Sequence, residues 1–292
     1  MQLKTPMNPK LSIITINLNN IGGLKKTIES VLEQLYSDFE YLIIDGGSTD
    51  GSQNLIRSNA SKISYWISEP DNGIYHAMNK GIRAAKGEYF LFLNSGDFLV
   101  NNKVLTEVFK EDHTEDILWG TSRYSRNGQV LFSSPSPEKL TLKFFYNQTI
   151  SHQSTFIRSG LFKEYGNYRE DFKINSDYEF WIRTIILNNC STKKLDILVS
   201  DYNLEGLSGS QNNLELSRKE SKKILTLSIP QRILDDYSVW MEERKQLEVM
   251  YWFKSKQWIY RFLVFLHKTA INFILWKKRF RNKSIGNAEL EL

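Results

Sequence analysis

The sequence contains little cysteine and no long apolar run. Cys190 is the only cysteine in 292 residues, so an intramolecular disulfide is excluded and a reducing compartment is favoured. No run reaches the roughly 18 consecutive apolar residues that a transmembrane helix requires. Residues 1–10 also lack the apolar segment of a secretory signal. We therefore expect a cytoplasmic protein of ordinary globular composition, with 41 % hydrophobic and 24 % charged residues.

Several common cofactor motifs are also missing. The GxGxxG pattern of dinucleotide-binding folds does not follow the first predicted strand, where the nearest glycines are Gly22 and Gly23. The chain has no Walker A loop. Its four histidines and one cysteine are scattered, without the spacing of a zinc site. These absences disfavour an NAD-type, P-loop or zinc-binding protein.

The first half of the chain alternates apolar runs, which suit buried strands, with segments whose apolar residues recur at helical spacing. Strands are predicted over residues 11–16, 39–44, 63–67 and 88–93, and helices over residues 24–35, 53–57 and 74–85. This alternation predicts βαβ units, right-handed connections and a mostly parallel sheet. Open α/β sheets bind ligands in the crevice outside the carboxyl ends of their strands.

Acidic residues follow two of these predicted strands. Asp45, in DGGSTDGS, can accept hydrogen bonds from a nucleobase or ribose, and Gly46 lets a ligand approach the backbone closely. Asp97, in LNSGD, is the kind of carboxylate that holds Mg²⁺ together with substrate phosphates. Asn94 and Ser95 are placed to orient waters or to bind ribose. Taken alone, each motif is also explained as an ordinary turn.

Two further charged residues follow the third predicted strand, in SEPDNGIYHAMNKG. Asp71 lies in the loop, close enough to join a nucleotide pocket. Lys80 lies in the following helix, where it either reaches a phosphate or is simply solvated.

A third acidic motif, INSDYEFW, lies further along the chain. A helix is predicted to begin near Ser176, and residues two apart on a helix do not face the same way. Asp177 and Glu179 therefore cannot face one reaction centre equally well, and acids in a first helical turn are also simply stabilising. His152, in ISHQSTF, is interpreted either as a structural residue or as a ligand of phosphate or acceptor.

Five motifs in this order resemble family 2 glycosyltransferases: LSIITINLNN, YLIIDGGSTDGS, ISEPDNGIYHAMNKGIRAAKGEYFLFLNSGD, SHQSTF and SDYEFW. The resemblance covers residues 10–210. It implies a GT-A fold over residues 1–235, that is, an α/β Rossmann-like sandwich with a mostly parallel central sheet. A basic, aromatic C-terminal helical extension is expected over residues 236–292. The EPDNGIYHAMNKG segment most resembles bacterial exopolysaccharide and colanic-acid-type glycosyltransferases.

The resemblance also implies roles for individual residues. Asn17, Asn19 and Asp45 correspond to positions that hold the nucleoside of a nucleotide-sugar donor. Asp97 corresponds to the ligand of a divalent cation, Mg²⁺ or Mn²⁺. Asp177 corresponds to the catalytic base of an inverting displacement, with Glu179 as the runner-up.

Two positions depart from the family pattern. Gly96 stands where many members carry a second aspartate, so cation binding rests on one carboxylate. Ser176 stands where many members have an acid, which leaves Asp177 as a single carboxylate. The segment Leu204–Ser210 resembles the family's acceptor-side flap, and its glycines would permit movement.

The net charge of +5 conceals a basic segment, because residues 249–288 hold nine Lys or Arg and no Asp or Glu. Lys254, Arg261 and Lys268 recur every seven residues among many aromatic side chains, so on one helix they form a narrow polar stripe. That pattern is typical of an interfacial helix on an anionic membrane. It predicts membrane-surface contact through residues 249–283, at the inner face of a bacterial plasma membrane. A helix packed on the catalytic domain is the alternative, and no motif indicates nucleic-acid binding.

The predicted function is an inverting glycosyltransferase of surface polysaccharide biosynthesis that moves a sugar from a nucleotide-sugar donor to a glycan or lipid-linked acceptor. One alternative is a nucleotidyltransferase, but that class usually has a Gly-rich, Arg- or Lys-bearing loop after its first strand, and the loop here is rich in asparagine without arginine. The other alternative is a non-catalytic sugar-binding or scaffold protein of the same fold, since the cation motif is reduced.

Overall fold

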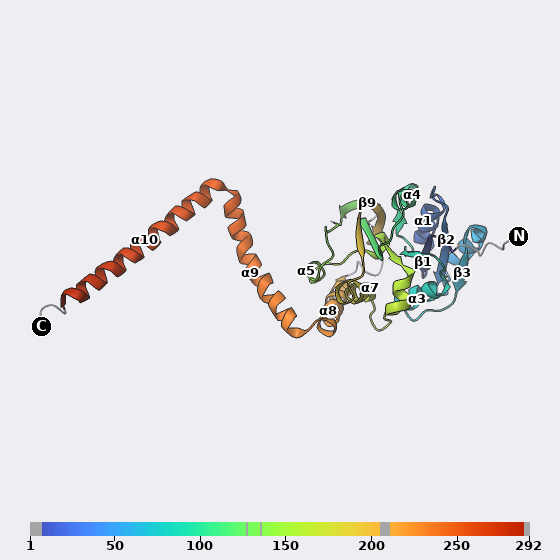
Figure 1. Ribbon diagram of the computed structural model, residues 1–292. Coiled ribbons are helices and arrows are strands. Elements are labelled where there is room, and N and C mark those ends of the chain that lie inside the picture. The colour runs from blue at the N-terminus through green and yellow to red at the C-terminus, as the bar shows by residue number, and fades with distance from the viewer. Residues whose placement is uncertain (1–7, 127, 135, 205–210, 289–292) are drawn as a thin grey trace. The chain divides into compact units, whose positions relative to one another are not determined.

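The computed structural model describes residues 8–126, 128–134, 136–204 and 211–288 (Figure 1). Most of the predicted acceptor-side flap, residues 205–210, lies outside the described residues. The chain divides into two compact units, Met1–Ile229 and Pro230–Leu292. The sequence placed this boundary between residues 235 and 236, whereas the units part at Pro230, a residue that cannot continue a helix.

The first unit is built from short strands and helices. Its described strands are β1 Leu11–Asn17, β2 Phe39–Asp45, β3 Tyr65–Ser68, β4 Tyr89–Phe92, β5 Phe98–Leu99, β6 Ile117–Arg126, β7 Gln129–Ser133, β8 Thr155–Arg158 and β9 Thr192–Asn203. Its described helices are α1 Ile21–Leu32, α2 Ser52–Ser58, α3 Ile74–Ala84, α4 Val104–Val108, α5 Leu142–Phe145, α6 Ser159–Tyr165, α7 Ser176–Trp181 and α8 Gln211–Ser228. Short 3₁₀ turns span Ala60–Lys62 and His152–Ser154, and a π-helical turn spans Ile182–Leu187.

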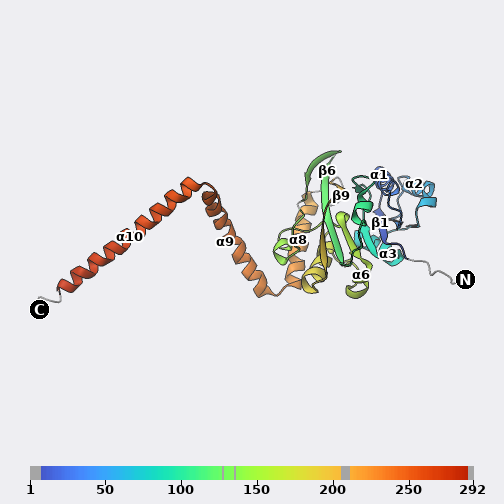
Figure 2. The same cartoon turned by 45° about the horizontal axis from the view of Figure 1, so that its top comes forward.

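These strands form one sheet in the order β3-β2-β1-β4-β8-β6-β9-β5, and β7 pairs with β6. β1 is parallel to β2 and β4, β2 is parallel to β3, and β6 is parallel to β9. β8 runs antiparallel to both β4 and β6, and β5 and β7 are antiparallel to their partners. Figure 2 shows the long strands β6 and β9 side by side. The predicted mostly parallel sheet is therefore confirmed.

Helices cover both faces of the parallel strands, which is why these strands are almost continuously apolar. On one face, Ile13 of β1 belongs to a buried cluster with Leu24 of α1 and Val104 of α4. On the other face, Gly81 of α3 lies directly against Ile14 of β1. A Cβ at Gly81 would lie 2.4 Å from Ile14 Cγ2, so a larger residue would push α3 off the sheet.

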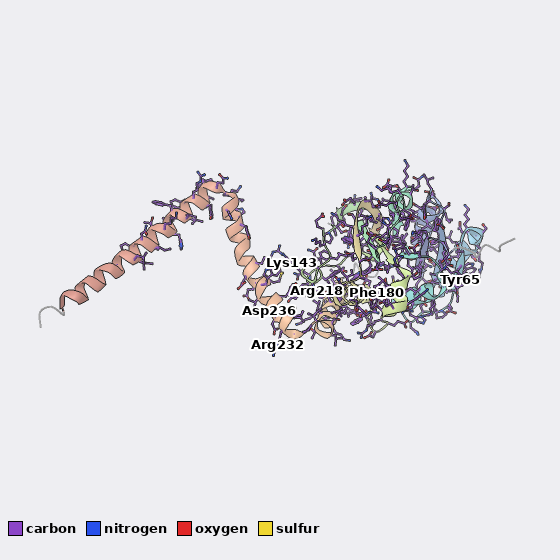
Figure 3. All side chains as sticks on the ribbon, viewed as in Figure 1. Tyr65, Lys143, Phe180, Arg218, Arg232 and Asp236 are labelled. Carbon is purple, nitrogen blue, oxygen red and sulfur yellow. The ribbon has the colours of Figure 1, made fainter. Side chains whose placement is uncertain are left out.

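Aromatic rings extend this second face toward α7. Phe162 of α6 lies 5.7 Å from Phe90 of β4, and it stacks on Phe180 of α7 at 4.6 Å (ring centroids). Figure 3 shows Phe180 within the first unit. This packing fixes α7 against the sheet, and with it Asp177 near the start of the helix.

The elements predicted for the first half are present with shifted ends. The first helix begins at Ile21, because the Asn20 side chain accepts a hydrogen bond from Gly23 N–H and caps the helix. The third strand begins at Tyr65 rather than at residue 63, because residues 60–62 form a 3₁₀ turn and the chain becomes extended only after it. The elements beyond residue 100 were largely not predicted, since short strands there give weak periodic patterns.

One edge of the sheet gathers the candidate site residues. The parallel strands β1, β2 and β3 end there, at Asn17, Asp45 and Ser68. The antiparallel strands β5 and β8 begin there, directly after Asp97 and Ser154. Segments distant in sequence therefore meet at this edge because two strands of the sheet are reversed.

The second unit, in its described part, consists of α9 Gln231–Ser255 and α10 Gln257–Ala288. Side chains stand out from α9 and from the first part of α10 in Figure 3. Large apolar side chains of α10 are exposed, among them Trp258 at 74 % and Phe265 at 64 %. No helix among the described residues is both long enough and apolar enough to cross a membrane.

The predicted single polar stripe is wrong in one respect. Lys254 lies in α9, whereas Arg261 and Lys268 lie in α10, so the three residues do not share one helix. The chain bends between the two helices, as Figure 1 shows. At the end of α9 the Ser255 hydroxyl donates a hydrogen bond to the Trp252 carbonyl at 2.7 Å.

Candidate active site

Asp45 ends β2 with a carboxylate that is completely buried. Its Oδ1 accepts hydrogen bonds from Asn17 Nδ2 (2.7 Å) and from the Ser48 hydroxyl (2.6 Å). Its Oδ2 accepts from Ser48 N–H (2.9 Å) and from the Ser68 hydroxyl (2.5 Å). Burial raises the pKa of Asp45, but the hydrogen bonds outweigh burial and hold this pKa below the ordinary value of 3.8. The charged carboxylate thus ties together the ends of β1, β2 and β3.

The Asp45 side chain is 0 % exposed in this arrangement, and its contact with a nucleoside stays a prediction. Asp45 positions its neighbours. Asn17 Oδ1 has no hydrogen-bond partner, and Gly46 lies so close to Asp71 that a Cβ on the glycine would be 3.3 Å from Asp71 Oδ2. Asn17, Gly46 and Asp71 therefore meet beside Asp45 at the strand ends.

Asn19 joins two of the loops at this edge. Its backbone is left-handed, with φ of 48°, and its N–H donates to the Ser48 hydroxyl at 2.8 Å. Its side-chain oxygen accepts from Thr49 N–H at 2.8 Å. The exposed Asn19 therefore ties the loop after β1 to the loop after β2.

Asp71 and Lys80 form an ion pair across the loop that precedes α3. Lys80 Nζ lies 2.7 Å from Asp71 and 2.7 Å from Glu69, and it donates to the Pro70 carbonyl at 3.2 Å. Burial lowers the pKa of Lys80, but the two carboxylates raise it by more than burial lowers it, so the net shift of this pKa is upward. The sequence left open whether Lys80 binds phosphate or is solvated. In this structure Lys80 braces the loop before α3. His76 also contacts Asp71, at 3.2 Å.

The turn at residues 94–97 is built around a left-handed glycine. Gly96 has φ of 107°, and its N–H donates to the Thr27 hydroxyl at 3.0 Å. A Cβ at Gly96 would also lie 3.3 Å from Asn203 Nδ2. An aspartate at this position would therefore be strained, which gives a physical reason for the departure from the family pattern. The Ser95 carbonyl accepts from Asn20 Nδ2 at 2.9 Å, which links the turn to α1.

Asp97 is a buried carboxylate held by two neutral donors. Its Oδ1 accepts from Asn203 N–H (3.1 Å), its Oδ2 accepts from Gln153 Nε2 (3.1 Å), and the side chain is almost fully buried. Burial raises the pKa of Asp97 to about 6, although these hydrogen bonds and the nearby His152 act in the opposite direction. The charged form of Asp97 therefore lacks a strong countercharge.

The residues at this turn fit a divalent cation that is held partly by substrate. Asp97 offers an undercompensated carboxylate, and Asn94 Oδ1 is buried without a hydrogen-bond partner. Mg²⁺ commonly uses one or two protein oxygens together with phosphates and water. Among the described residues there is no group of three or more His, Cys, Asp or Glu that could hold a metal ion.

Asp177 faces the same edge from α7. Its Oδ1 accepts from Tyr178 N–H (2.9 Å) and lies 3.0 Å from the Tyr75 hydroxyl, whose one proton is shared with the Ile174 carbonyl. Its Oδ2 lies 2.9 Å from His152 Nδ1. The carboxylate is held by three polar contacts and is still 15 % exposed, as a proton acceptor must be.

His152 bridges the two halves of the site. Its Nδ1 contacts Asp177, and its Nε2 lies 3.3 Å from Asn94 Nδ2. With Asn94 as donor, Nε2 is the acceptor and the proton is on Nδ1, directed at Asp177. The histidine therefore connects the candidate base with the turn that carries Asp97.

Glu179, the runner-up for the base, has a structural role instead. It is buried, and its carboxylate pairs with Arg183 at 2.9 Å on the next helical turn. Arg183 also donates to the carbonyls of Gly166 and Asn167 at 3.0 Å each. The two acids of SDYEFW thus point in different directions, as helical spacing requires.

Helix α8 fixes the loop that leads into α7. The Glu220 carboxylate accepts from the backbone N–H groups of Lys173 (2.7 Å), Ile174 (3.0 Å) and Asn175 (3.0 Å). The Asn175 side chain donates to the Ser217 carbonyl at 2.6 Å. These bonds hold the loop directly before α7, and therefore the position of Asp177 in the first turn of that helix.

Sequence reasoning missed some members of this site. Tyr75 and Gln153 lie inside motifs that carried the family resemblance, but nothing in their residue types marked them as partners of the two aspartates. Asn203 contributes a backbone N–H, which no sequence pattern reveals. His152 was left open between a structural and a ligand role, and the structure places it between Asp177 and Asn94.

A sequence profile described as "Glycosyl transferase family 2" matches residues 12–166, more than half of the chain. A Mycobacterium tuberculosis protein described as an uncharacterized glycosyltransferase is 32 % identical over 68 % of this chain and 77 % of its own length. A Mycobacterium bovis "PGL/p-HBAD biosynthesis glycosyltransferase" is 30 % identical over 67 % of this chain and 77 % of its own. The chain belongs to glycosyltransferase family 2, and it is a glycosyltransferase.

Solved structures confirm the fold. Staphylococcus aureus TarS, residues 1–349 in complex with UDP-GlcNAc, aligns with a TM-score of 0.60 and 21 % identity, over 78 % of this chain and 70 % of that one. The mannosyltransferase PcManGT from Pyrobaculum calidifontis, in complex with GDP-Man and Mn²⁺, aligns with a TM-score of 0.52 and 17 % identity, over 68 % of this chain and 57 % of that one. The predicted GT-A architecture is therefore present.

The Asp45 network makes a testable prediction about stability. Replacing Ser68 with alanine removes a hydrogen bond to a buried charge, and we expect it to lower the free energy of unfolding by about 1.5–3 kcal/mol at neutral pH. Because the folded-state pKa of Asp45 is lowered, its contribution is complete above the ordinary value of 3.8 and is lost as pH falls through the folded-state pKa. The difference between wild type and Ser68→Ala should therefore shrink in denaturant titrations below pH 3.8.

Ser58→Ala is the matched control, since that exposed hydroxyl contacts only neutral groups, the Leu55 carbonyl at 2.8 Å and the Asn59 side-chain amide at 3.4 Å. It should cost much less stability. A Ser68→Ala effect that is equally small, or that does not change with pH, would contradict the assignment of a charged, structurally required Asp45.

Proposed function

We propose that this glycosyltransferase moves a sugar, with inversion, from a nucleoside-diphosphate sugar to a hydroxyl of a glycan or lipid-linked acceptor in bacterial surface polysaccharide biosynthesis. The observation that carries the proposal is that Asp177 and Asp97 lie at one sheet edge, connected through His152 and Asn94. A proton acceptor and a diphosphate-binding turn are the two groups that such a reaction needs. The relatives crystallised with UDP-GlcNAc and with GDP-Man and Mn²⁺ support this class of donor.

The donor's nucleoside is proposed to lie against Asn17, Asn19, Gly46 and Asp71. These residues meet at the ends of β1 and β2, and Asn17 Oδ1 lacks a hydrogen-bond donor. Asp45 and Lys80 act indirectly, since both are engaged in bracing the loops. The donor's diphosphate would then extend toward Asn94, Ser95 and Asp97.

Asp97 and Asn94 would hold Mg²⁺ or Mn²⁺ through their side-chain oxygens. When bound, such a cation offsets the negative charge that develops on the leaving nucleoside diphosphate. The chain's own contribution is to bury these side-chain oxygens and to hold the Asp97 carboxylate through the left-handed turn at Gly96 and the hydrogen bonds from Gln153 and Asn203.

Asp177 is proposed as the catalytic base. Its carboxylate takes the proton of the acceptor hydroxyl while the acceptor oxygen bonds to the anomeric carbon. The bond from that carbon to the diphosphate oxygen breaks, and the nucleoside diphosphate leaves with the electron pair. Tyr75 and His152 hold the carboxylate in one orientation, so no rearrangement is needed at the moment of transfer.

Activity assays with an Asp177 variant test this function. Wild-type protein is incubated with UDP-, GDP- and dTDP-sugars and a bacterial lipid extract, with Mg²⁺, with Mn²⁺ and with EDTA. We expect one donor to be turned over only with a cation, and Asp177→Asn to lower kcat by about 10²–10⁴-fold, the usual contribution of a general base. Donor affinity, measured by calorimetry, should change little, because asparagine keeps the shape of the side chain.

Asp196→Asn makes the same chemical change at a side chain that is 87 % exposed, and it should be fully active. Asp97→Ala should abolish the effect of cations. A protein that binds a donor but turns none over, and whose behaviour Asp177→Asn does not alter, would instead be the non-catalytic sugar-binding scaffold.

His152 should act by positioning Asp177. We expect His152→Ala to lower kcat about 10–100-fold with little change in donor KM, because the base loses a partner but donor contacts remain. His152→Asn should recover part of kcat, since the asparagine amide can supply the donor that Nδ1–H provided. An equal loss in both variants, appearing in donor KM rather than kcat, would show that His152 binds the donor and does not orient the base.

The second unit is proposed to contact an anionic membrane surface. Arg261 and Lys268 lie on α10 among exposed aromatic side chains such as Trp258 and Phe265. Each Lys or Arg near an anionic surface contributes about 1 kcal/mol. A membrane-side position would suit a lipid-linked acceptor and a cytoplasmic, peripheral enzyme.

Vesicle sedimentation tests this contact. The double variant Arg261→Gln and Lys268→Gln should bind vesicles containing phosphatidylglycerol about 30-fold more weakly than wild type, since two charges are lost. Lys62→Gln with Lys139→Gln removes the same charge from the first unit and should bind like wild type. Equal binding to neutral vesicles, or no binding together with full activity after deletion of residues 249–292, would contradict the proposal.

A further inference from the structure

Three aromatic side chains cross neighbouring strands beside the candidate site. Tyr124 of β6 stacks on Phe132 of β7, with ring centroids 4.7 Å apart, and meets Tyr202 of β9 edge-on at 5.2 Å. Tyr124 is the register partner of both residues, so all three side chains lie on one face of the sheet. We call Phe132, Tyr124 and Tyr202 the aromatic row.

The inner part of the row adjoins the catalytic groups. The Tyr124 hydroxyl lies 2.7 Å from the Ser151 hydroxyl, and Ser151 directly precedes His152. Tyr202 directly precedes Asn203, whose N–H holds Asp97. Burial raises the pKa of Tyr124, and the negative charges of Asp97 and Asp177 raise it further, which places this ring within electrostatic reach of both carboxylates.

The outer end of the row is exposed on an edge strand. Val130, Leu131 and Phe132 are 53 %, 52 % and 55 % exposed, and within the described residues β7 pairs only with β6. Proteins usually protect such edges with charges or proline, because an apolar edge promotes aggregation. Three consecutive exposed apolar residues are therefore costly unless a ligand or partner covers them.

Polar groups near the row are engaged elsewhere. The Tyr124 hydroxyl is occupied by Ser151, and Arg123 pairs with Asp201 at 2.5 Å from the opposite face of β6. The accessible surface at the exposed end of the row, at Val130, Leu131 and Phe132, is therefore mainly ring and aliphatic carbon. Such a surface favours an apolar ligand group over a hydroxyl-rich one.

We propose that the aromatic row is an acceptor subsite that binds an apolar aglycone, with the acceptor's reactive hydroxyl directed to Asp177. The proposal rests on the proposed function, because it takes Asp177 as the base. The row extends from Tyr124, which contacts Ser151 beside His152, to the exposed apolar edge of β7, so an acceptor whose hydroxyl is at Asp177 would lay its adjoining group along it. The bound group is identified by chemistry alone, as an alkyl, polyprenyl or aryl portion next to the acceptor hydroxyl.

A fluorine probe on the row tests this without requiring turnover. The full chain carries 4-fluorophenylalanine in place of Phe132 only, and its ¹⁹F spectrum is recorded with methyl β-D-glucoside or with octyl β-D-glucoside below its micelle concentration. We expect octyl glucoside to shift the signal in a saturable way and methyl glucoside to leave it unchanged. Leu131→Ser should weaken octyl glucoside binding about fivefold, because half of a leucine side chain no longer contributes apolar contact.

Leu35→Ser is the matched control, since Leu35 is 63 % exposed and lies just after α1, whereas Leu131 lies on β7 next to Phe132 of the row. It should not change octyl glucoside affinity. In parallel, Leu131→Ser should raise KM for the lipid-extract acceptor without changing donor affinity measured by calorimetry. If the wild-type protein bound no donor, that result would count against the proposed function. The fluorine signal with octyl glucoside would still test the acceptor subsite, because it does not depend on donor binding.

Three results would overturn the proposal. An equal shift with both glucosides would show that the row binds the sugar ring. Concentration-dependent dimerisation in sedimentation experiments, lost in Leu131→Ser, would show that a second copy of the chain covers β7. A signal at residue 132 that neither glucoside changes would show that the row binds no such acceptor.

Discussion

The reversed direction of β8 is the constraint on which this active site depends. Between the parallel strands β4 and β6, β8 runs the opposite way, so its first residues lie where its neighbours end. That reversal brings Ser151, His152 and Gln153 to the edge that also carries Asp97. If β8 were parallel, these residues would lie at the far end of the sheet and the link between Asp97 and Asp177 would not exist.

Buried charge at this edge serves two different purposes. Asp45 is surrounded by donors, its pKa is lowered, and it stabilises the fold by joining three strand ends. Asp97 has only two neutral donors, its pKa is raised to about 6, and its charged form is left undercompensated. The first arrangement favours structure, whereas the second favours an added cation. Two aspartates that look equivalent at strand ends are separated by their surroundings.

The first half of the fold was predictable because parallel strands and their covering helices follow strong periodic patterns. Strands near residues 11, 39 and 89 and the helix beginning at Ile74 were found from apolar spacing alone. The second half was not, since β5, β7 and β8 are short and their pairing depends on distant partners. The break between α9 and α10, which separates Lys254 from Arg261, also escaped prediction, because the heptad spacing of the basic residues does not indicate where a helix ends.

The sequence by itself determined the family, the strand-end positions of Asp45 and Asp97, and the divergence of Asp177 from Glu179. These follow from motif order and from the fixed periods of helices and strands, which need no tertiary contact. Only the tertiary structure decided that the Asp45 carboxylate is buried among donors, that Lys80 braces a loop, and that His152 joins Asp177 to Asn94. Burial and hydrogen-bond partners depend on segments far apart in the chain, so no local pattern could specify them.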